Sequence, residues 1–273
     1  MNNQVFLTGA SGFVGKLLNK FLERKKLKVT KAVHKSSRHK KDIKIDLTKK
    51  IYLKRNFNWI IHTAAHHKIN DFKIKPKLKA KKNILMVKNL IDFSKKNNIK
   101  NFVFFSTIDI NYSPYPANKD IYIKSKTFCE KILLTALKKN ILKKLIILRL
   151  PAIVGKKSGD NFIKKTFNNF KKNLPVNIWN KNDKYNNLIH ISDLNKLIFY
   201  FIAGKNKRKK IIIDCLSSKP IKLKVLVNNL KKRLNSKSKV NYIDKENKFK
   251  KIKFNSKINY NFFTVKKVID LLI

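Results

Sequence analysis

The sequence has few acidic residues, few cysteines and no long apolar run. Its 273 residues contain 15 Asp and Glu against 66 Lys and Arg, which gives a formal net charge of +51 at pH 7. The two cysteines, Cys129 and Cys215, show no Cys-x-x-Cys or Cys/His spacing. They argue against a disulfide framework and a zinc site, and favour free thiols in a reducing cytoplasm. No apolar stretch approaches the ~20 residues of a membrane span, and no signal-peptide pattern is present. We therefore expect a cytoplasmic protein without a membrane segment or a bound metal.

Arginine is scarce as well, since it accounts for only six of the 66 basic residues. A dedicated nucleic-acid reader would be richer in arginine, because the guanidinium forms bidentate contacts with phosphate and guanine. The lysines are spread along the whole chain, and abundant Lys, Asn and Ile are typical of an AT-rich genome. The charge therefore predicts a weak, salt-sensitive attraction to polyanions and no specific nucleic-acid partner.

Glycine is the most informative of the scarce residues. Three of only six glycines, Gly9, Gly12 and Gly15, stand three apart near the N-terminus. They follow an apolar run, Val5–Thr8, and precede apolar residues with the spacing of a helix face. This strand, turn and helix start predict a pyrophosphate cradle: Gly9 permits the tight turn, Gly12 leaves room for the anion, and Gly15 lets the helix pack closely. The positive end of the helix dipole favours the anion further.

Apolar runs alternate with helical patterns through the first half of the chain. This alternation predicts an α/β fold with a doubly wound parallel sheet covered by helices on both faces. We expect further strands at Val29–Val33, Ile43–Ile45, Trp59–Ile61, Asn101–Phe105, Leu145–Leu150 and Lys210–Ile213. We expect further helices at Ile84–Phe93, Ile121–Leu137, Leu223–Leu234 and Thr264–Ile273, and a strand edge followed by a helix within Ile189–Phe201.

The alternation becomes irregular after Gly155, which indicates a second and smaller part of the chain. We predict a nucleotide-binding domain of residues 1–155 and 186–214. Residues 156–185 and 215–273 would then form a small C-terminal α/β substrate lobe. The Lys/Asn-rich stretch 236–256 is the linker candidate, and we expect it to be a mobile loop.

The end of the second strand indicates which dinucleotide would bind. A carboxylate there binds the adenosine ribose, whereas a basic residue accommodates a 2′-phosphate. His34, Lys35 and Arg38 occupy this region without an Asp or Glu. This favours NADP over NAD, although the lysine-rich composition explains the same residues. Asp46, just past the third strand, is a candidate partner for the adenine amine, or alternatively a helix cap.

Tyr122 and Lys126 stand at i and i+4 in a predicted helix, so their side chains lie on one face. An ammonium beside a phenol favours the phenolate and lowers a pKa that starts near ~10. Such a tyrosine exchanges a proton with a substrate hydroxyl while hydride moves to or from a nicotinamide. Thr107 ends the fifth strand, so all three groups would meet at the carboxyl end of the sheet, where doubly wound folds bind ligands. We predict these three residues as catalytic.

In chain order, these motifs resemble the extended short-chain dehydrogenase/reductase family, in its sugar-nucleotide epimerase/dehydratase group. The matching segments are Thr8–Gly15, Asp46-Leu47, Ile61–Ala65, Asn83, Ser106-Thr107, Tyr122-x-x-x-Lys126, Leu148–Gly155, Leu188–Asp193 and Ser217–Ile221. The resemblance implies a Rossmann-type fold. It also implies a set of cofactor-binding residues, to which we add His34 from the end of the second strand. The set is Gly9, Ser11, Gly12, Phe13, Val14, Gly15, His34, Asp46, Leu47, Ala64, Ala65, Asn83, Tyr122, Lys126 and Pro151.

The resemblance also implies an activity, with some departures. It implies an NAD(P)-dependent 4-epimerase or 4-keto reductase that acts at a sugar carbon of a nucleotide sugar. In the family's dehydratases Asp-Glu follows the Thr, whereas Ile108-Asp109 follows here, which argues against dehydration. Asn111-Tyr112 replaces the family's Tyr-Gly. Relatives commonly pair through the tyrosine-bearing helix, so a homodimer is expected by analogy.

A non-catalytic NAD(P)-binding sensor or scaffold on the same fold is the alternative. Retention of Thr107, Tyr122 and Lys126 together argues against it. Arg149 is expected to be structural or to contact a nucleotide phosphate. His190 and Asp193 are expected to brace the domain junction. The histidines 66 and 67 are expected to be loop residues that could line the nicotinamide site.

Overall fold

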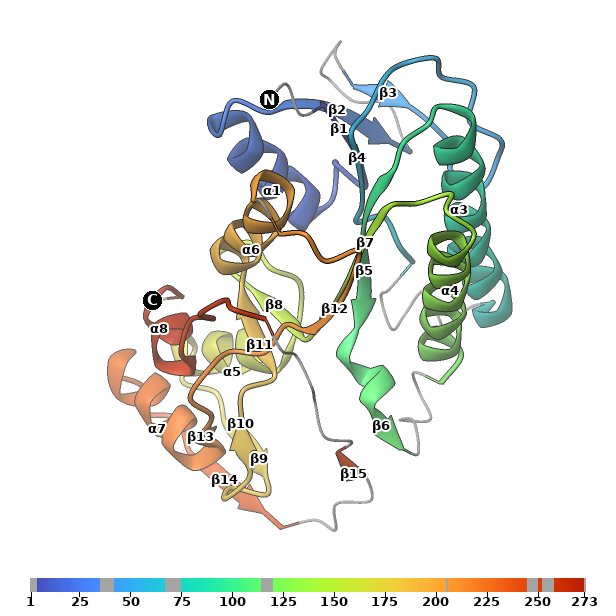
Figure 1. Ribbon diagram of the computed structural model, residues 1–273. Helices are drawn as coiled ribbons and strands as arrows, with labels where there is room; N and C mark the ends of the chain where they lie inside the picture. Colours follow the sequence, from blue (N-terminus) through green and yellow to red (C-terminus); the bar gives the residue numbers. More distant parts are fainter. Residues whose placement is uncertain are drawn as a thin grey trace. The chain divides into compact units, whose positions relative to one another are not determined.

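The computed structural model describes residues 4–34, 42–66, 75–113, 120–204, 206–244, 250–251 and 258–272. The chain forms two compact units (Figure 1). The first is built on residues 1–149 and 198–214, and the second on residues 150–197, 215–250 and 258–273.

A seven-stranded parallel sheet forms the centre of the first unit and confirms the predicted doubly wound α/β fold. Its strands, in order across the sheet, are β12 (Lys210–Asp214), β7 (Lys144–Leu150), β5 (Asn101–Thr107), β4 (Trp59–His62), β1 (Gln4–Thr8), β2 (Lys28–Val33) and β3 (Ile43–Lys44). The strand order reverses direction at β1, which lies between β4 and β2 and is parallel to both. Ligands of doubly wound sheets bind outside the carboxyl ends of the strands at such a point.

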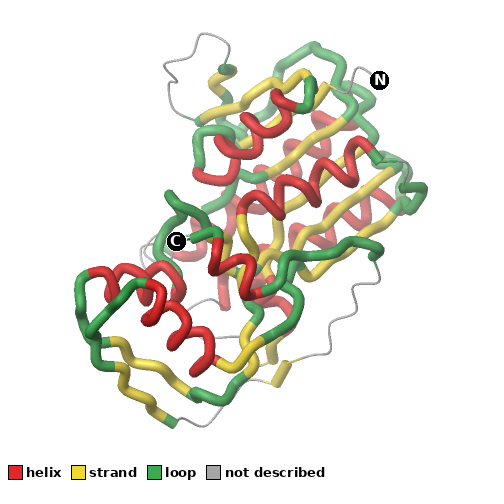
Figure 2. The backbone as a smooth tube through the Cα atoms, turned by 90° about the vertical axis from the view of Figure 1, so that its left-hand side faces the viewer, coloured by secondary structure: helices red, strands yellow, loops and turns green. Residues whose placement is uncertain are grey.

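Helices of the first unit cover the two faces of the sheet. Figure 1 shows α1 (Phe13–Arg24) on one face, and α3 (Pro76–Lys96) beside α4 (Asp120–Lys138) on the other. Viewed after a quarter turn, the strands run side by side beneath the helices (Figure 2). The inner strands are buried on both faces, which explains why they are continuous apolar runs rather than alternating ones. The rings of Phe6, Phe57 and Phe93 pack together in the core, with the centroids of Phe6 and Phe93 5.2 Å apart.

The described part of the second unit is made of short sheets and helices. Its strand pairs are β8 (Ala152–Val154) with β11 (Leu188–His190), β9 (Val176–Trp179) with β14 (Val240–Ile243), and β10 (Lys184–Tyr185) with β13 (Ile221–Lys222). Its helices are α5 (Phe162–Lys171), the first part of α6 (Ile191–Ala203), α7 (Leu223–Arg233) and α8 (Val265–Asp270). A separate buried apolar cluster joins α5, α7 and α8, and Ile163, Leu226 and Val268 belong to it.

The boundaries of the two units differ from the predicted domains. Residues 150–155 and 186–197 group with the second unit instead of the nucleotide-binding part. The pairing of β8 with β11 explains this, because both strands hydrogen-bond to each other in a small sheet of their own. The predicted loop at 236–256 contains β14, and its residues 245–249 and 252–256 lie outside the described residues. No helix within the described ranges is long and apolar enough to cross a membrane.

Candidate active site

The glycine turn joins β1 to α1 and is shaped by backbone crowding. Gly9 has φ +70°, and a Cβ placed there would lie 2.6 Å from the backbone nitrogen of Ala64. A Cβ on Gly15 would overlap the carbonyl oxygen of Gly9, so only glycine lets the helix start so close to the strand. Gly12 is different, because the nearest atom to a Cβ there is the carbonyl oxygen of Gly9 at 3.3 Å. Apart from that oxygen and the neighbouring residues, no atom of the described chain lies within 4 Å of the Cβ position, which leaves room for an anion there.

The start of α1 has no side-chain cap. Gly12 is the N-cap residue and has no side chain, so the cap residue supplies no side-chain hydrogen bond to the first turn. The first N–H groups of a helix have no partner within the helix, and the helix dipole makes this end positive. Ser11 and Gly12 are exposed, and Phe13 and Val14 are half-buried. These residues fit the pyrophosphate of a dinucleotide, which would accept hydrogen bonds from the helix start.

The predicted adenosine end lies after β2 and β3. His34, the residue after β2, is exposed, while Lys35 and Arg38 lie outside the described residues. Oδ1 of Asp46 accepts hydrogen bonds from the hydroxyl of Thr48 at 2.7 Å and from its backbone N–H at 2.9 Å. These two bonds lower the pKa of Asp46, with a further contribution from the charge of His34. Asp46 therefore caps a turn in an ionised form, and both bonds use one of its oxygens.

The loop after β4 is held by Asn83. The Asn83 amide accepts from the backbone N–H of His66 at 2.9 Å and donates to the His66 carbonyl at 3.1 Å. Asn83 is buried and thus fixes the half-buried residues Ala64 and Ala65 through the loop. Both amide bonds of Asn83 go to the backbone of this loop, so Asn83 would position the loop that lines a cofactor. His67 lies outside the described residues.

Lys126 occupies the position expected for the ammonium. Its Nζ donates a 2.7 Å hydrogen bond to the carbonyl of Phe105 near the end of β5. The same nitrogen lies 4.7 Å from the ring centroid of Phe104 and 5.9 Å from that of Tyr122. Burial lowers the pKa of Lys126 to about 8, against raising effects of Cys129 and Glu130. The structure therefore brings the ammonium and the phenol ring of the predicted pair together.

The expected effect of Lys126 on the pKa of Tyr122 is wrong. Burial raises the pKa of Tyr122 above its ordinary value, and the charges of Asp109 and Cys129 raise it further. Lys126 spends its short hydrogen bond on the Phe105 carbonyl and contacts the face of the Tyr122 ring. The phenol is therefore protonated at neutral pH in this structure, which is the form that donates a proton.

Thr107 is buried and caps the short 3₁₀ helix η1 (Ile108–Asn111) that follows β5. Its Oγ1 donates to Oδ2 of Asp109 at 3.2 Å and accepts from the backbone N–H of Asp109 at 3.3 Å. The carboxylate of Asp109 thus lies beside the threonine hydroxyl and raises the pKa of Tyr122. Sequence reasoning treated Asp109 only as the remnant of a broken acid pair and missed this proximity.

A buried polar network next to these residues was also missed. Ser106 Oγ donates to Glu130 Oε1 at 2.5 Å, and Arg149 bonds both oxygens of Glu130. Arg149 also donates to Asn111, which donates to Asp214. The sequence places Glu130 one helical turn after Lys126, but it carries no signal for the pairing of Glu130 with Arg149. The structural role predicted for Arg149 agrees with these bonds, which occupy all three nitrogens of its guanidinium.

Leu47 is buried in the first unit, whereas Pro151, His190 and Asp193 lie in the second. Pro151 is buried just after β7. Asp193 is buried and accepts hydrogen bonds from the Tyr260 hydroxyl at 2.7 Å and from the Phe263 N–H at 2.8 Å, so it anchors the C-terminal segment within this unit. His190 Nδ1 accepts from the Ser192 N–H at 3.2 Å. These contacts are structural, and no metal-binding cluster of His, Cys, Asp and Glu is found among the described residues.

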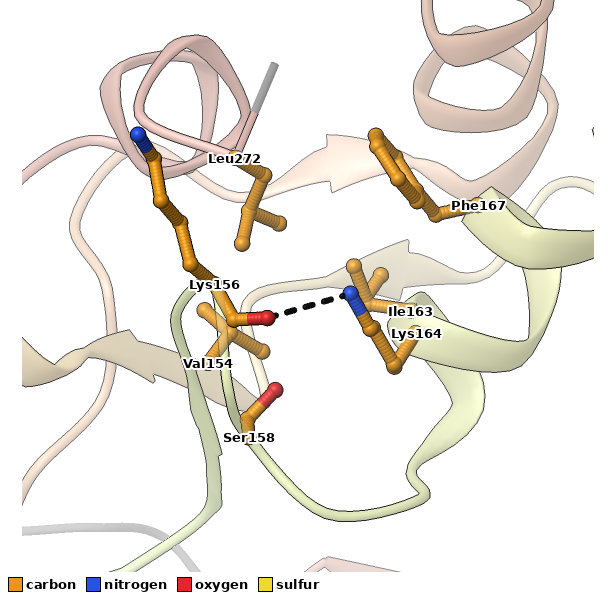
Figure 3. Close-up of a pocket in the computed structure, with 7 residues that line it drawn as sticks. All are labelled: Val154, Lys156, Ser158, Ile163, Lys164, Phe167 and Leu272. Carbon is orange, nitrogen blue, oxygen red and sulfur yellow. Dashed lines mark hydrogen bonds between the residues drawn. The ribbon is translucent and has the colours of Figure 1, made fainter. Parts of the chain in front are cut away.

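Figure 3 shows a pocket in the second unit that contains none of the predicted site residues. It encloses about 240 Å³ of space, part of it open to solvent. Lys164 Nζ donates across it to the Lys156 carbonyl at 3.4 Å. Its other lining residues are Val154, Ser158, Ile163, Phe167 and Leu272. The pocket is smaller than ordinary small-molecule sites and does not itself indicate a substrate.

The model of the NAD dependent epimerase/dehydratase family matches residues 5–214. The chain belongs to this family. The match covers the glycine turn, η1 and α4, and thus every predicted catalytic residue. It confirms the family resemblance of the sequence motifs. A comparison with curated protein sequences gives no significant match.

Solved structures with the same fold are only distantly related in sequence. UDP-glucose 4-epimerase from Thermotoga maritima, solved with UDP-glucose, has a TM-score of 0.73 at 15% identity and covers 98% of this chain and 96% of its own. RMD from Pseudomonas aeruginosa, complexed with NADPH, has a TM-score of 0.70 at 15% identity, and the match covers 89% of this chain and 87% of RMD. TunA, an NAD dependent NDP-hexosamine 5,6-dehydratase involved in tunicamycin biosynthesis, has a TM-score of 0.75 at 14% identity, with 98% and 96% covered. This epimerase/dehydratase family member therefore has the fold of enzymes with several activities.

Proposed function

We propose that this protein is an NAD(P)-dependent oxidoreductase or epimerase that acts at a sugar carbon of a nucleotide sugar. The observation that carries the proposal is the meeting of Thr107, Tyr122 and Lys126 around the carboxyl end of β5. Lys126 Nζ is bonded to the end of that strand and lies 5.9 Å from the Tyr122 ring centroid. Thr107 is the last residue of the same strand. In the sheet, only β4 separates β5 from β1 and its glycine turn.

The dinucleotide would lie across the carboxyl ends of β1, β4 and β5. The uncapped start of α1 and the open side of Gly12 would hold its pyrophosphate, and Ala64 and Ala65 would line its path. When bound, the nicotinamide supplies or accepts the hydride. Lys126 would hold the nicotinamide ribose with donor hydrogens that the Phe105 carbonyl does not use. His34 and the basic residues after it favour NADP over NAD.

Tyr122 would move the proton that balances the hydride. In reduction, the protonated phenol donates its proton to the carbonyl oxygen as the hydride reaches the carbon. In oxidation, the phenolate takes the proton of the substrate hydroxyl. Thr107 would hydrogen-bond the same substrate oxygen. Because burial raises the pKa of Tyr122, the phenol holds the proton that the reductive step requires. A 4-epimerase would use both steps in turn and keep its cofactor.

The replacement of Tyr122 by Phe tests the proposal. The variant should lose nearly all turnover with a panel of UDP-sugars and their 4-keto forms, because the phenolic proton is gone. It should still bind NAD(P)H, since the ring remains. An active Phe variant would refute the assignment of Tyr122. A wild-type protein that binds NADPH but converts no member of the panel would support the non-catalytic sensor.

Two further features complete the proposal. Cys129 and Cys215 are buried and are not joined in a disulfide, which fits the reducing cytoplasm. Pairing of two copies through α4 remains a prediction that rests on analogy with relatives.

A further inference from the structure

Arg149 bridges α4, which carries Tyr122 and Lys126, and η1, which Thr107 caps. Its Nε and Nη2 donate to Oε1 and Oε2 of Glu130 on α4, at 3.2 and 2.9 Å. Its Nη1 donates to Oδ1 of Asn111, the last residue of η1, at 2.8 Å. Arg149 itself is on β7 and therefore belongs to a third element. All of these residues lie in the first unit.

The positions of the two partners make this bridge relevant to catalysis. Glu130 follows Lys126 by one helical turn and Tyr122 by two, so all three lie along one face of α4. Asn111 ends the single helical turn that Thr107 caps. Arg149 thus links the helix that presents the phenol and the ammonium to the turn that presents the threonine hydroxyl. We propose that Arg149 is a positioning residue that holds Thr107 in register with Tyr122 and Lys126.

The bridge is buried and closed at both ends by further bonds. The side chain of Glu130 is 6% exposed and that of Arg149 21% exposed. Ser106, the neighbour of Thr107, donates to Glu130 Oε1. On the other side, Asn111 Nδ2 donates to Asp214 Oδ1 at 2.9 Å. The guanidinium can only donate and the carboxylate can only accept, so the amide of Asn111 has a single satisfied orientation. These bonds leave η1 little freedom to rotate.

Lysine cannot replace arginine in this bridge. The planar guanidinium forms two parallel bonds to Glu130 and a third to Asn111, whereas an ammonium is a compact charge without a fork. Arg149→Lys therefore keeps the charge that Glu130 needs in a buried place but loses the link to Asn111. The variant separates positioning from simple charge balance, because complete removal of the charge would leave a buried carboxylate unpaired.

The inference rests on the proposed function, and the test combines turnover with a readout that needs no substrate. The variants are Arg149→Lys, Asn111→Ala and the two combined. The matched control is Lys144→Met at the opposite end of the same strand. Lys144 Nζ donates to the Asn206 carbonyl at 2.7 Å and lies 5.7 Å from the Trp59 ring centroid, so its loss removes buried contacts far along the strand from the site.

We expect Arg149→Lys and Asn111→Ala each to lower kcat by about 10- to 100-fold, as small misplacements of reacting groups do, with KM for cofactor nearly unchanged. The double variant should be no slower than the slower single variant, because both changes break the same link. Lys144→Met should lower the melting temperature at unchanged kcat. Multiplying effects in the double variant, or a kcat in Arg149→Lys that matches the control at equal loss of melting temperature, would overturn the proposal.

Hydrogen exchange separates a failure of this inference from a failure of the proposed function. The N–H of Asp109 donates to the Thr107 hydroxyl, and that of Tyr112 donates to the Asp109 carbonyl. In Arg149→Lys these two amides should exchange faster than in the wild type, while amides of β1 stay protected. Unchanged exchange at both would contradict the positioning role even in a protein with no turnover. Faster exchange there in a protein without turnover would support the bridge and count against the enzymatic assignment alone.

Discussion

Replacement of each glycine in the turn by alanine should separate folding from cofactor binding. At Gly12, φ is −75° and an added Cβ meets only the Gly9 carbonyl oxygen, at 3.3 Å. Alanine adopts this backbone conformation without strain. Because alanine is a poor N-cap residue, the substitution should lower the free energy of unfolding by about 0.5–1 kcal/mol. The new methyl group would occupy the open side of the turn, where we place the pyrophosphate. Gly12→Ala should therefore weaken NAD(P)H binding at least about tenfold, or about 1.4 kcal/mol, with a small loss of stability.

Gly9→Ala and Gly15→Ala should instead lower the free energy of unfolding, because the added Cβ crowds the backbone of the turn. The φ of +70° at Gly9 costs an alanine about 1–2 kcal/mol, and its Cβ would press on the Ala64 nitrogen. At Gly15 the Cβ meets the backbone carbonyl of Gly9, which cannot move without shifting the strand end. Urea unfolding and fluorescence titration with NADPH on the three variants make the comparison. A Gly12→Ala protein that binds NADPH like the wild type would refute the placement of the anion.

Two other predictions follow from the titrating groups. Asp109→Asn keeps an acceptor for the Thr107 hydroxyl but removes a charge that raises the pKa of Tyr122. The pH profile of kcat should therefore shift to lower pH. A profile that stays in place or shifts to higher pH would contradict the role of that charge. Burial lowers the pKa of His62 to about 3, so the unfolded chain binds the proton first as pH falls below ~6.5. Unfolding free energy should therefore drop by about 2 kcal/mol between pH 7 and pH 5, and His62→Gln should remove this drop in urea titrations. Equal pH dependence in the two proteins would show that His62 is not its source.

The central sheet was predictable because its signals are local. The apolar runs at Val5–Thr8 and Leu145–Leu150 are buried on both faces, and the strands begin and end within a residue or two of the expected positions. The second unit was less predictable. The strand Val176–Trp179 pairs with Val240–Ile243, more than 60 residues away, and both are only four residues long. Their apolar residues become informative only once the pairing is known.

In the candidate site, too, the features with local sequence signals were predictable and those that depend on distant residues were not. The glycine turn and the spacing of Tyr122 and Lys126 can be seen in a few neighbouring residues. The hydrogen bonds of Arg149 cannot, because its partners Glu130 and Asn111 come from other elements and carry no shared motif. The prediction that Lys126 lowers the pKa of Tyr122 was wrong for a related reason. The sequence shows which charge stands four residues away, but not that the phenol is buried or that Asp109 is near.

Transfer of a labelled hydride tests the central claim most directly. The protein would be incubated with a 4-keto UDP-sugar and with NADPH, or separately NADH, that carries deuterium on the reactive face of the nicotinamide. The account predicts that mass spectrometry finds one deuterium on the sugar carbon with the wild type and none with Tyr122→Phe. Deuterium that reaches the sugar equally well in both proteins would contradict it.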